Sequence, residues 1–333
     1  MSDPAKLKVV KQVDRPDILF SIARLPESTQ LYVGSSDQRV YSFDAFDEKS
    51  KPQAFVGHRS YVSGLVLTDS GQLVSGGYDG RLIWWNRESR DQVRSLTAHQ
   101  KWIRRVDVTP DGRTVVTVAD DMVCRLWDAE SGKLLRELRG HKPQTPHHFP
   151  SMLFCTGISS DGKLLATADK VGHIVVWEIS SGKKLKELDA PKMYTWDPKQ
   201  RIHSIGGIRS LAFSADSRLL AVGGIGQIGN VDHLGALARL EVFDWQKGER
   251  THEFPGDKFK GLFERLIFHP QGKWLLGAGG DHNGFIKFID LDSKKVIRQE
   301  KAPMHIHDLV VDENYNRIYA AGHGKVVVWE MDG

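Results

Sequence analysis

The chain has 333 residues, of which 40% are hydrophobic and 26% charged, a balance typical of a soluble globular protein with an apolar core. Its 46 Lys and Arg residues against 42 Asp and Glu leave a formal net charge of only +4, which argues against a nucleic-acid or membrane partner. We expect neither a secretory leader nor a membrane span, because the first residues are polar and no run of about eighteen apolar residues occurs. The two cysteines, Cys124 and Cys155, lack metal-ligand spacing and suggest free thiols in a reducing, cytoplasmic location.

Short apolar strands recur along the chain, and seven of them end in an aromatic ring. The rings are Phe43, Trp85, Trp127, Trp177, Phe243, Phe288 and Trp329, at successive intervals of 42, 42, 50, 66, 45 and 41 residues. A period of about 40 residues with one ring per period indicates an array of similar units rather than one irregular core.

Each unit is predicted to contain four short strands joined by tight turns. In the third unit the inner strand is expected over residues 103–108 and the second strand over 113–117, with Pro110-Asp111-Gly112 between them. Glycine supplies the positive φ that such turns require. Seven repeats of four antiparallel strands predict an all-β fold, a single seven-bladed propeller over residues 1–333.

The units resemble WD40 repeats, whose signature has Gly-His at the head and Trp-Asp at the tail. The pattern appears as Gly57-His58 with Trp85-Asn86, Ala98-His99 with Trp127-Asp128, and Gly140-His141 with Trp177-Glu178. The resemblance is strongest in units two to four and weaker toward the chain ends.

The resemblance implies a buried hydrogen-bonded chain in each such unit, formed by a turn Asp, the head His, a strand Ser or Thr, and the Trp. The implied chains are His58, Ser75, Asp79 and Trp85 in the second unit, and His99, Thr117, Asp121 and Trp127 in the third. In the fourth unit Val171 occupies the turn position, so we expect His141 to lack an acidic anchor.

The last unit is predicted to be completed by the N-terminus. The sequence ends soon after the ring strand of this unit, whereas residues 7–13 precede the first inner strand without another role. We expect residues 7–13 to pair with the last blade, since an unpaired blade edge would otherwise remain open.

Three insertions, residues 142–151, 190–207 and 225–237, are expected on one face over blades four and five. Loops on a rigid scaffold commonly carry binding residues. The alternative is that they only cover an imperfect blade.

The start of the inner strands is rich in arginine, and these positions should surround the channel mouth on the insertion face. The candidate partner-binding residues there are Arg104, Arg105, Arg209 and Arg265. Guanidinium groups favour carboxylates or phosphates, although pairing with Glu264 and Asp308 is an equal alternative.

Aromatic residues add to this surface, because aromatic and Arg side chains dominate interface energetics. The WD40 resemblance implies partner contacts beside the head His and turn Asp, at Tyr61, Tyr78, Trp102 and Asp120. The second insertion contributes Tyr194 and Trp196. For Tyr61 and Trp102 the alternative is packing at the blade edge.

A metal site in the loops is a weaker hypothesis. His147, His148, His203 and His233 lie in or beside the insertions, and a His/carboxylate cluster can hold zinc or iron. Their spacing matches no known ligand motif, so no metal is predicted. No cofactor is predicted either: Gly224, Gly226 and Gly229 have dinucleotide-loop spacing but lead into a strand instead of a helix.

The sequence therefore predicts a non-catalytic scaffold that binds a protein or peptide, preferably acidic, at the insertion face and channel mouth. No nucleophile or metalloprotease motif is present, so we do not expect an enzyme. The alternative is a propeller that binds a small ligand or metal through its loop histidines and hydrolyses a substrate. The sequence leaves the oligomeric state open.

Overall fold

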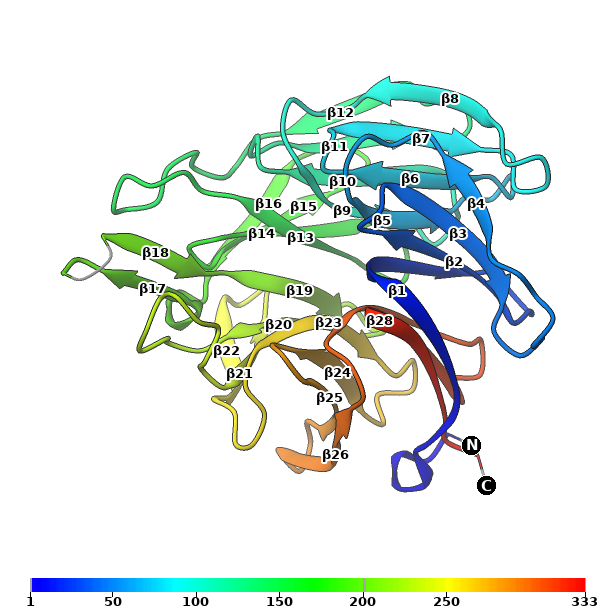
Figure 1. Ribbon diagram of the computed structural model, residues 1–333. Helices are drawn as coiled ribbons and strands as arrows, with labels where there is room; N and C mark the ends of the chain where they lie inside the picture. The colour runs from blue at the N-terminus through cyan, green and yellow to red at the C-terminus, as the bar shows by residue number, and fades with distance from the viewer. Residues whose placement is uncertain (1, 200–201, 333) are drawn as a thin grey trace.

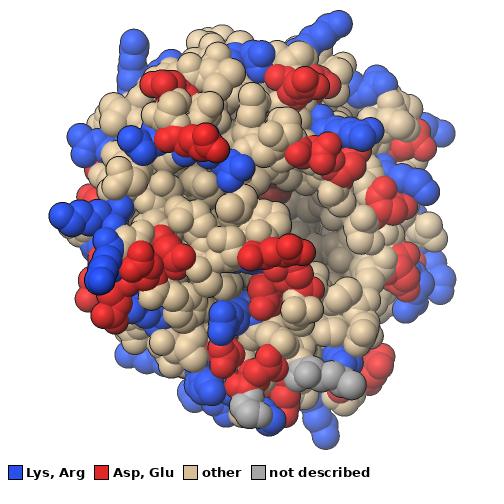
Figure 2. Space-filling model, turned by 90° about the vertical axis from the view of Figure 1, so that its right-hand side faces the viewer, with Lys and Arg blue, Asp and Glu red and all other residues tan. Residues whose placement is uncertain are grey.

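The structure is a computed structural model that describes residues 2–199 and 202–332. Consecutive antiparallel sheets follow one another around a common axis, as the colour gradient in Figure 1 shows. A view turned by 90°, in which the right-hand side of Figure 1 faces the viewer, shows a rounded face with a hollow (Figure 2). Residues 1, 200, 201 and 333 of the predicted domain, two of them in the second insertion, lie outside the described residues.

Five sheets within the described residues have four strands each. The first sheet consists of β5 (Val62–Leu67), β6 (Leu73–Gly77), β7 (Arg81–Trp85) and β8 (Gln92–Thr97). The second consists of β9 (Ile103–Val108), β10 (Thr114–Ala119), β11 (Cys124–Asp128) and β12 (Leu134–Leu138). The third is β13 (Leu153–Ile158), β14 (Leu164–Asp169), β15 (His173–Glu178) and β16 (Lys184–Asp189). The fourth consists of β19 (Ile208–Phe213), β20 (Leu219–Ile225), β21 (Ala238–Asp244) and β22 (Glu249–Phe254). The fifth consists of β23 (Leu262–Phe268), β24 (Leu275–Gly280), β25 (Gly284–Asp290) and β26 (Lys295–Ala302).

A six-stranded sheet joins the two ends of the chain. Its order is β27 (Ile306–Val311), β28 (Arg317–Glu330), β1 (Lys8–Arg24), β2 (Gln30–Ser35), β3 (Arg39–Asp44) and β4 (Gln53–Val56). The N-terminal part of β1 pairs with β28, from Lys8 opposite Glu330 to Asp14 opposite Lys325, and its later part pairs with β2. In Figure 1 the blue β1 and the red β28 lie side by side accordingly.

The remaining elements are small. A two-stranded hairpin, β17 (Tyr194–Asp197) and β18 (His203–Gly206), forms most of the second insertion and projects at the left of Figure 1. Two short 3₁₀ turns are η1 (Pro4–Lys6) and η2 (Pro191–Met193). No helix among the described residues is long and apolar enough to cross a membrane.

The core consists of apolar layers between neighbouring sheets. All seven repeated rings are buried, with at most 6% of their surface exposed. One layer, for example, combines Val74 and Trp84 of one sheet with Val106 and Trp127 of the next. The strands are rich in β-branched residues because these pack well on a pleated, buried surface.

The predicted turn glycines adopt the conformation expected of them. Gly112 has a φ of +69°, and a Cβ atom there would lie 2.4 Å from the backbone nitrogen of Asp69 in the preceding sheet. Glycine therefore supplies both the left-handed turn and the close approach of two blades.

The all-β propeller with four-stranded antiparallel blades is confirmed. The number of seven blades and the closing role of residues 7–13 stay predictions.

We predict that deletion of residues 1–13 causes loss of soluble, cooperatively folded protein, since it removes the β1 backbone ladder and leaves β28 as an open edge. The measurement is thermal unfolding of the soluble fraction. The matched control is the double substitution Lys8→Ala and Gln12→Ala, which changes two exposed side chains and keeps the ladder. A truncated chain that melts like the full chain would contradict the expectation.

Candidate functional site

The second repeat contains a continuous buried hydrogen-bond chain. His58 Nδ1 lies 3.0 Å from Asp79 Oδ2, His58 Nε2 lies 2.7 Å from Ser75 Oγ, and Trp85 Nε1 donates to Ser75 Oγ at 2.8 Å. The geometry assigns the proton of His58 to Nδ1, so that the Ser75 hydroxyl donates to Nε2 and accepts from the indole. Every donor in this buried set therefore has an acceptor.

The third repeat has the same arrangement with an additional cation. His99 lies 3.1 Å from Asp121 and 2.7 Å from Thr117, and Trp127 donates to Thr117 at 2.9 Å. Arg125 contacts Asp121 at 2.8 Å. Burial raises the pKa of the Asp121 carboxyl, but His99 and Arg125 outweigh it and hold that pKa below its ordinary range.

The expectation that the fourth repeat lacks an acidic anchor is wrong. Asp169, two residues before Val171, accepts from His141 Nδ1 at 3.0 Å, while His141 Nε2 and Trp177 both contact the Thr167 hydroxyl. Asp169 lies at the end of β14, and its other carboxylate oxygen accepts from the backbone nitrogen of Val171. The carboxylate thus reaches the histidine from the strand end instead of from the turn.

Four aromatic rings form a row at the start of the first three inner strands. Phe20 and Tyr61 have ring centroids 5.3 Å apart, Tyr61 and Tyr78 are 5.7 Å apart, and Tyr78 stacks on Trp102 at 4.6 Å with planes 3° apart. Two of the four rings remain accessible, since Tyr61 is 44% and Trp102 49% exposed. We call Phe20, Tyr61, Tyr78 and Trp102 the aromatic row.

Arg104 supports two rings of the aromatic row, those of Tyr78 and Trp102. Its guanidinium binds Asp120 with two 2.7 Å hydrogen bonds and lies 5.0 Å from the ring centroids of both Tyr78 and Trp102. Burial lowers the pKa of Arg104, but Asp120 and Tyr78 outweigh it and raise the pKa above its ordinary value. Arg104 and Asp120 therefore act together as a support for the stacked rings.

Arg105 and Arg265 point into the channel and are committed to carboxylates there. Arg105 lies 3.2 Å from both Asp107 and Asp308, and Arg265 lies 3.4 Å from Asp308 and 3.7 Å from Asp107. For these two arginines the geometry matches the alternative in which the channel arginines pair with carboxylates of the same chain.

Arg209 differs from the other three arginines. Its guanidinium carbon lies 3.5 Å from the centroid of the Phe154 ring, and Nη1 donates to the Gly206 carbonyl. Among the described residues no carboxylate lies within ion-pair distance of Arg209. Burial, together with the charge of Arg104, lowers the pKa of Arg209, and burial and Arg209 likewise lower the pKa of the nearby Lys170.

A cavity of about 190 Å³ occupies the channel mouth beneath the aromatic row. Its lining residues are Phe20, Ser63, Tyr78, Arg104, Arg105, Phe154, Arg209, Glu264 and His307. Two of its three arginines, Arg104 and Arg105, are paired with carboxylates, which leaves Arg209 and Glu264 as the other charged lining residues.

The insertions contact one another through the β17–β18 hairpin. The His147 ring stacks on Trp196 at 4.6 Å, and its Nδ1 lies 3.1 Å from the Tyr194 hydroxyl. On the other side of the hairpin the backbone nitrogen of Ile228 donates to Thr195 Oγ1 at 3.0 Å. Tyr194 and Trp196 are thus half-buried packing centres of this loop assembly and do not join the aromatic row.

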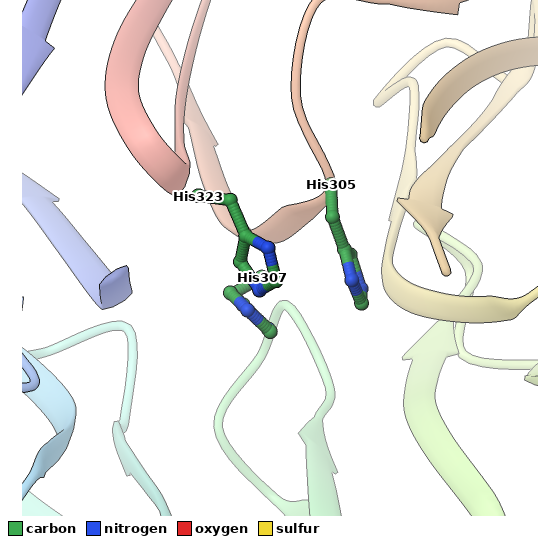
Figure 3. A group of neighbouring side chains, drawn as sticks. All are labelled: His305, His307 and His323. Atoms are coloured by element: carbon green, nitrogen blue, oxygen red, sulfur yellow. The ribbon is translucent and has the colours of Figure 1, made fainter. Parts of the chain in front are cut away.

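The four loop histidines do not assemble into a metal site. Within the described part of the chain, groups of at least three potential ligand atoms within 4.8 Å are formed by His305, His307 and His323 and by His141, Asp169 and His173. His147 is instead bound to Tyr194, and His203 contacts Phe149 edge-on. Figure 3 shows the first group, in which the rings of His305, His307 and His323 converge. This group was not predicted from the sequence, although His305 and His307 lie two residues apart where an inner strand begins.

Charge is finely mixed on the face shown in Figure 2. Lys and Arg alternate with Asp and Glu around the rim, and acidic side chains lie beside the central hollow. This face has no broad basic surface of the kind that binds a polyanion.

Comparison with known proteins agrees with the repeat architecture. The family model of the WD domain, G-beta repeat, matches residues 49–86 and 90–128. The chain is 24% identical over 288 residues to the guanine nucleotide-binding protein subunit beta-like protein of Encephalitozoon cuniculi, which covers 82% of this chain and 81% of the relative.

Two further relatives are much longer than this chain. It is 28% identical over 168 residues to apoptotic protease-activating factor 1 of Homo sapiens and 24% identical over 261 residues to telomerase protein component 1 of Mus musculus. These matches cover 50% and 78% of this chain but only 12% and 9% of the relatives. The similarity therefore concerns a small part of each relative.

We predict that Asp169→Ala lowers the free energy of unfolding by about 1–3 kcal/mol, because it removes the carboxylate acceptor of the buried His141 Nδ1 and leaves this nitrogen facing His173 Nδ1 at 3.3 Å. Urea denaturation followed by tryptophan fluorescence measures the change. The matched control Val171→Ala should cost at most about 0.5 kcal/mol. If Val171→Ala lowered the free energy of unfolding as much as Asp169→Ala or more, the anchor of His141 would lie at the turn.

We also predict that the free energy of unfolding falls as pH is lowered below about 6.5. Burial lowers the pKa of both His99 and His141, although their carboxylate partners oppose it. The unfolded chain then takes up protons at these histidines before the folded chain does, so the stabilisation is complete above the unfolded pKa and declines below it.

Urea denaturation at about pH 7.5 and 5.5 tests this dependence. The substitution His282→Ala, at a side chain that is 86% exposed, should leave the pH dependence unchanged. A free energy of unfolding that stays constant or rises on acidification would contradict it.

Proposed function

We propose that this chain, a member of the WD40-repeat family, is a non-catalytic scaffold that binds an acidic protein or peptide segment at the channel mouth. Proteins of this family are generally protein-interaction scaffolds, and the blades and repeats of this chain are of their kind. The observation that carries the proposal is the aromatic row, in which two half-exposed rings, Tyr61 and Trp102, are held rigidly beside the cavity that Arg209 lines.

The rigidity of the aromatic row supports a binding role. Tyr78 and Trp102 are stacked and supported by Arg104, so little conformational freedom is lost when a partner covers them. Exposed Trp and Tyr beside Arg is the composition found at the energetic centre of interfaces. A purely packing role for Trp102 would be expected to bury more of the ring.

The preference for an acidic segment rests on Arg209. Its charge is largely buried, and within the described residues it has no carboxylate at ion-pair distance. A partner carboxylate in the cavity would complete this pair, and Lys170 adds a second cation nearby. Arg104, Arg105 and Arg265 already bind Asp120, Asp107 and Asp308, so we assign them to supporting the site.

We infer further that the insertions 142–151, 190–207 and 225–237 extend this surface beside the mouth. The stacking of His147 on Trp196 and the bond from Ile228 to Thr195 support their acting as one unit. Tyr194 and Trp196 would then position the loops, with their exposed edges available to the partner.

We infer that the six-stranded sheet comprises two blades and that the ring has seven. β1 has 17 residues and β28 has 14, whereas no other strand exceeds 8. An apolar layer combines Leu19 and Phe43 with Tyr319 and Val328 of the same sheet, which requires that sheet to fold face to face. Residues 7–13 would then provide the outer strand of the last blade.

We also propose a cytoplasmic location. Cys124 and Cys155 are both free and buried, and burial raises the pKa of each thiol. Such thiols are suited to a reducing compartment and have no role in a disulfide framework.

The test is binding to an array of acidic, neutral and basic peptides, followed by Kd measurement for the strongest acidic peptide by fluorescence anisotropy. Trp102→Ala should weaken binding by about 30-fold, the effect of a central hot spot of about 2 kcal/mol. Arg209→Gln should reduce the preference for acidic over neutral peptides. The matched control Val93→Ala removes a side chain of similar exposure on an outer strand and should leave Kd unchanged.

Equal binding by the Trp102→Ala and Val93→Ala variants would contradict the proposed surface. Preferential binding of basic peptides would contradict the assigned chemistry. Binding to RNA with a steep dependence on salt, in place of peptide binding, would favour a nucleic-acid partner instead.

A further inference from the structure

Two groups of potential metal ligands exist in the described chain, and the fold accounts for one of them. In the group of His141, Asp169 and His173, both ring nitrogens of His141 are used: Nδ1 binds Asp169 and Nε2 binds Thr167. This group belongs to the buried hydrogen-bond chain of the fourth repeat. The group of His305, His307 and His323, which we call the histidine trio, has no counterpart in the other repeats.

The backbone brings the histidine trio together. His305 directly precedes β27 and His307 lies within it, beside a register shift between Ile306 and Asp308, and their rings stack with centroids 4.4 Å apart. His323 lies opposite in β28, where its backbone nitrogen donates to the carbonyl of His305 at 3.1 Å. A Cβ atom on Gly322 would lie 1.9 Å from that carbonyl oxygen, so glycine is required for this approach.

The three rings face one another closely, as Figure 3 shows. Their centroids are 4.4 Å apart for His305 and His307, 4.9 Å for His307 and His323, and 5.0 Å for His305 and His323. The candidate ligand atoms of the three imidazoles lie within 4.8 Å of one another and so face one small volume.

The ring nitrogens of the trio are not consumed by the fold. Nε2 of His305 and Nε2 of His307 are buried and have no hydrogen-bond partner in the described part of the chain. A buried imidazole nitrogen without a partner costs free energy, so its persistence in a native site requires a ligand or a function. His305 Nε2 lies 3.6 Å from Glu264 Oε1, within ion-pair distance but beyond hydrogen-bond length.

We propose that His305, His307 and His323 bind a divalent transition-metal ion, with zinc as the best match. Three imidazoles with a free fourth position are a common zinc ligand set. Glu264 Oε1, 3.6 Å from His305 Nε2, adds a negative charge that favours a cation at this position. His307 and Glu264 both line the cavity at the channel mouth, so the free position is open to a small ligand or to a partner side chain.

Only a small movement of the histidine side chains is needed to bind zinc. Tetrahedral zinc with Zn–N distances of about 2.0–2.1 Å places its ligand nitrogens roughly 3.3 Å apart. The candidate ligand atoms of the trio already lie within 4.8 Å of one another. Side-chain rotation closes this difference, and His323, whose side chain is exposed, has the freedom to move.

The test uses the untagged full chain, treated with a chelator and then equilibrated with Zn²⁺. We expect elemental analysis to find one zinc per chain and the melting temperature to rise with zinc. Replacement by Co²⁺ should produce the visible absorption bands of a tetrahedral nitrogen-ligated site.

Three substitutions locate the ion. His323→Ala, at an exposed position that should not impair folding, should weaken zinc binding by more than Glu264→Gln, which removes a nearby negative charge and no ligand. His173→Ala, from the group that belongs to the repeat architecture, is the matched control and should leave zinc affinity unchanged. Absence of zinc from the wild-type chain, or equal affinity in the wild type and His323→Ala, would overturn the proposal.

Discussion

The structure depends on one packing constraint: each sheet has two apolar faces, and each face must be covered by another sheet. The core is accordingly divided into layers, most of them shared by two neighbouring sheets, such as the layer in which Phe288 and Leu276 meet Leu309 and Trp329. In a row of such sheets, the outer faces of the first and last sheets stay uncovered unless the row closes on itself. β1 pairs with both β28 and β2, so the two ends of the chain are held in one sheet.

The same constraint determines what the centre of the ring contains. Inner strands converge on the axis, where Arg105 of β9 and Arg265 of β23 share the carboxylates of Asp107 and Asp308. Removal of one member would leave an uncompensated buried charge, so these pairs hold strands from distant parts of the sequence in one arrangement. The proposed binding groups, the aromatic row and Arg209, lie outside this network.

Much of the fold could be predicted from the sequence because the repeating signals are local: a ring at the end of a strand and a glycine in the turn. The functional site was harder to predict from the sequence than the fold. Asp169 was missed because the expected position in the turn, Val171, is two residues away from the strand end that delivers the carboxylate. The histidine trio was missed because His323 meets His305 only through the register of β27 and β28. Which arginines are paired depends on distances across the channel, which no sequence interval encodes.

The two proposed sites share one side chain. Phe20 stacks on Tyr61 at 5.3 Å and contacts the ring of His307 at 5.0 Å, so it belongs to the aromatic row and also borders the histidine trio. A metal ion that draws His307 toward His305 and His323 would change the packing of Phe20 against Tyr61, where a partner is proposed to dock. Coupling between binding sites is reciprocal. Any factor by which the metal changes the affinity for the partner must therefore equal the factor by which the partner changes the affinity for the metal, with Phe20 as the physical link.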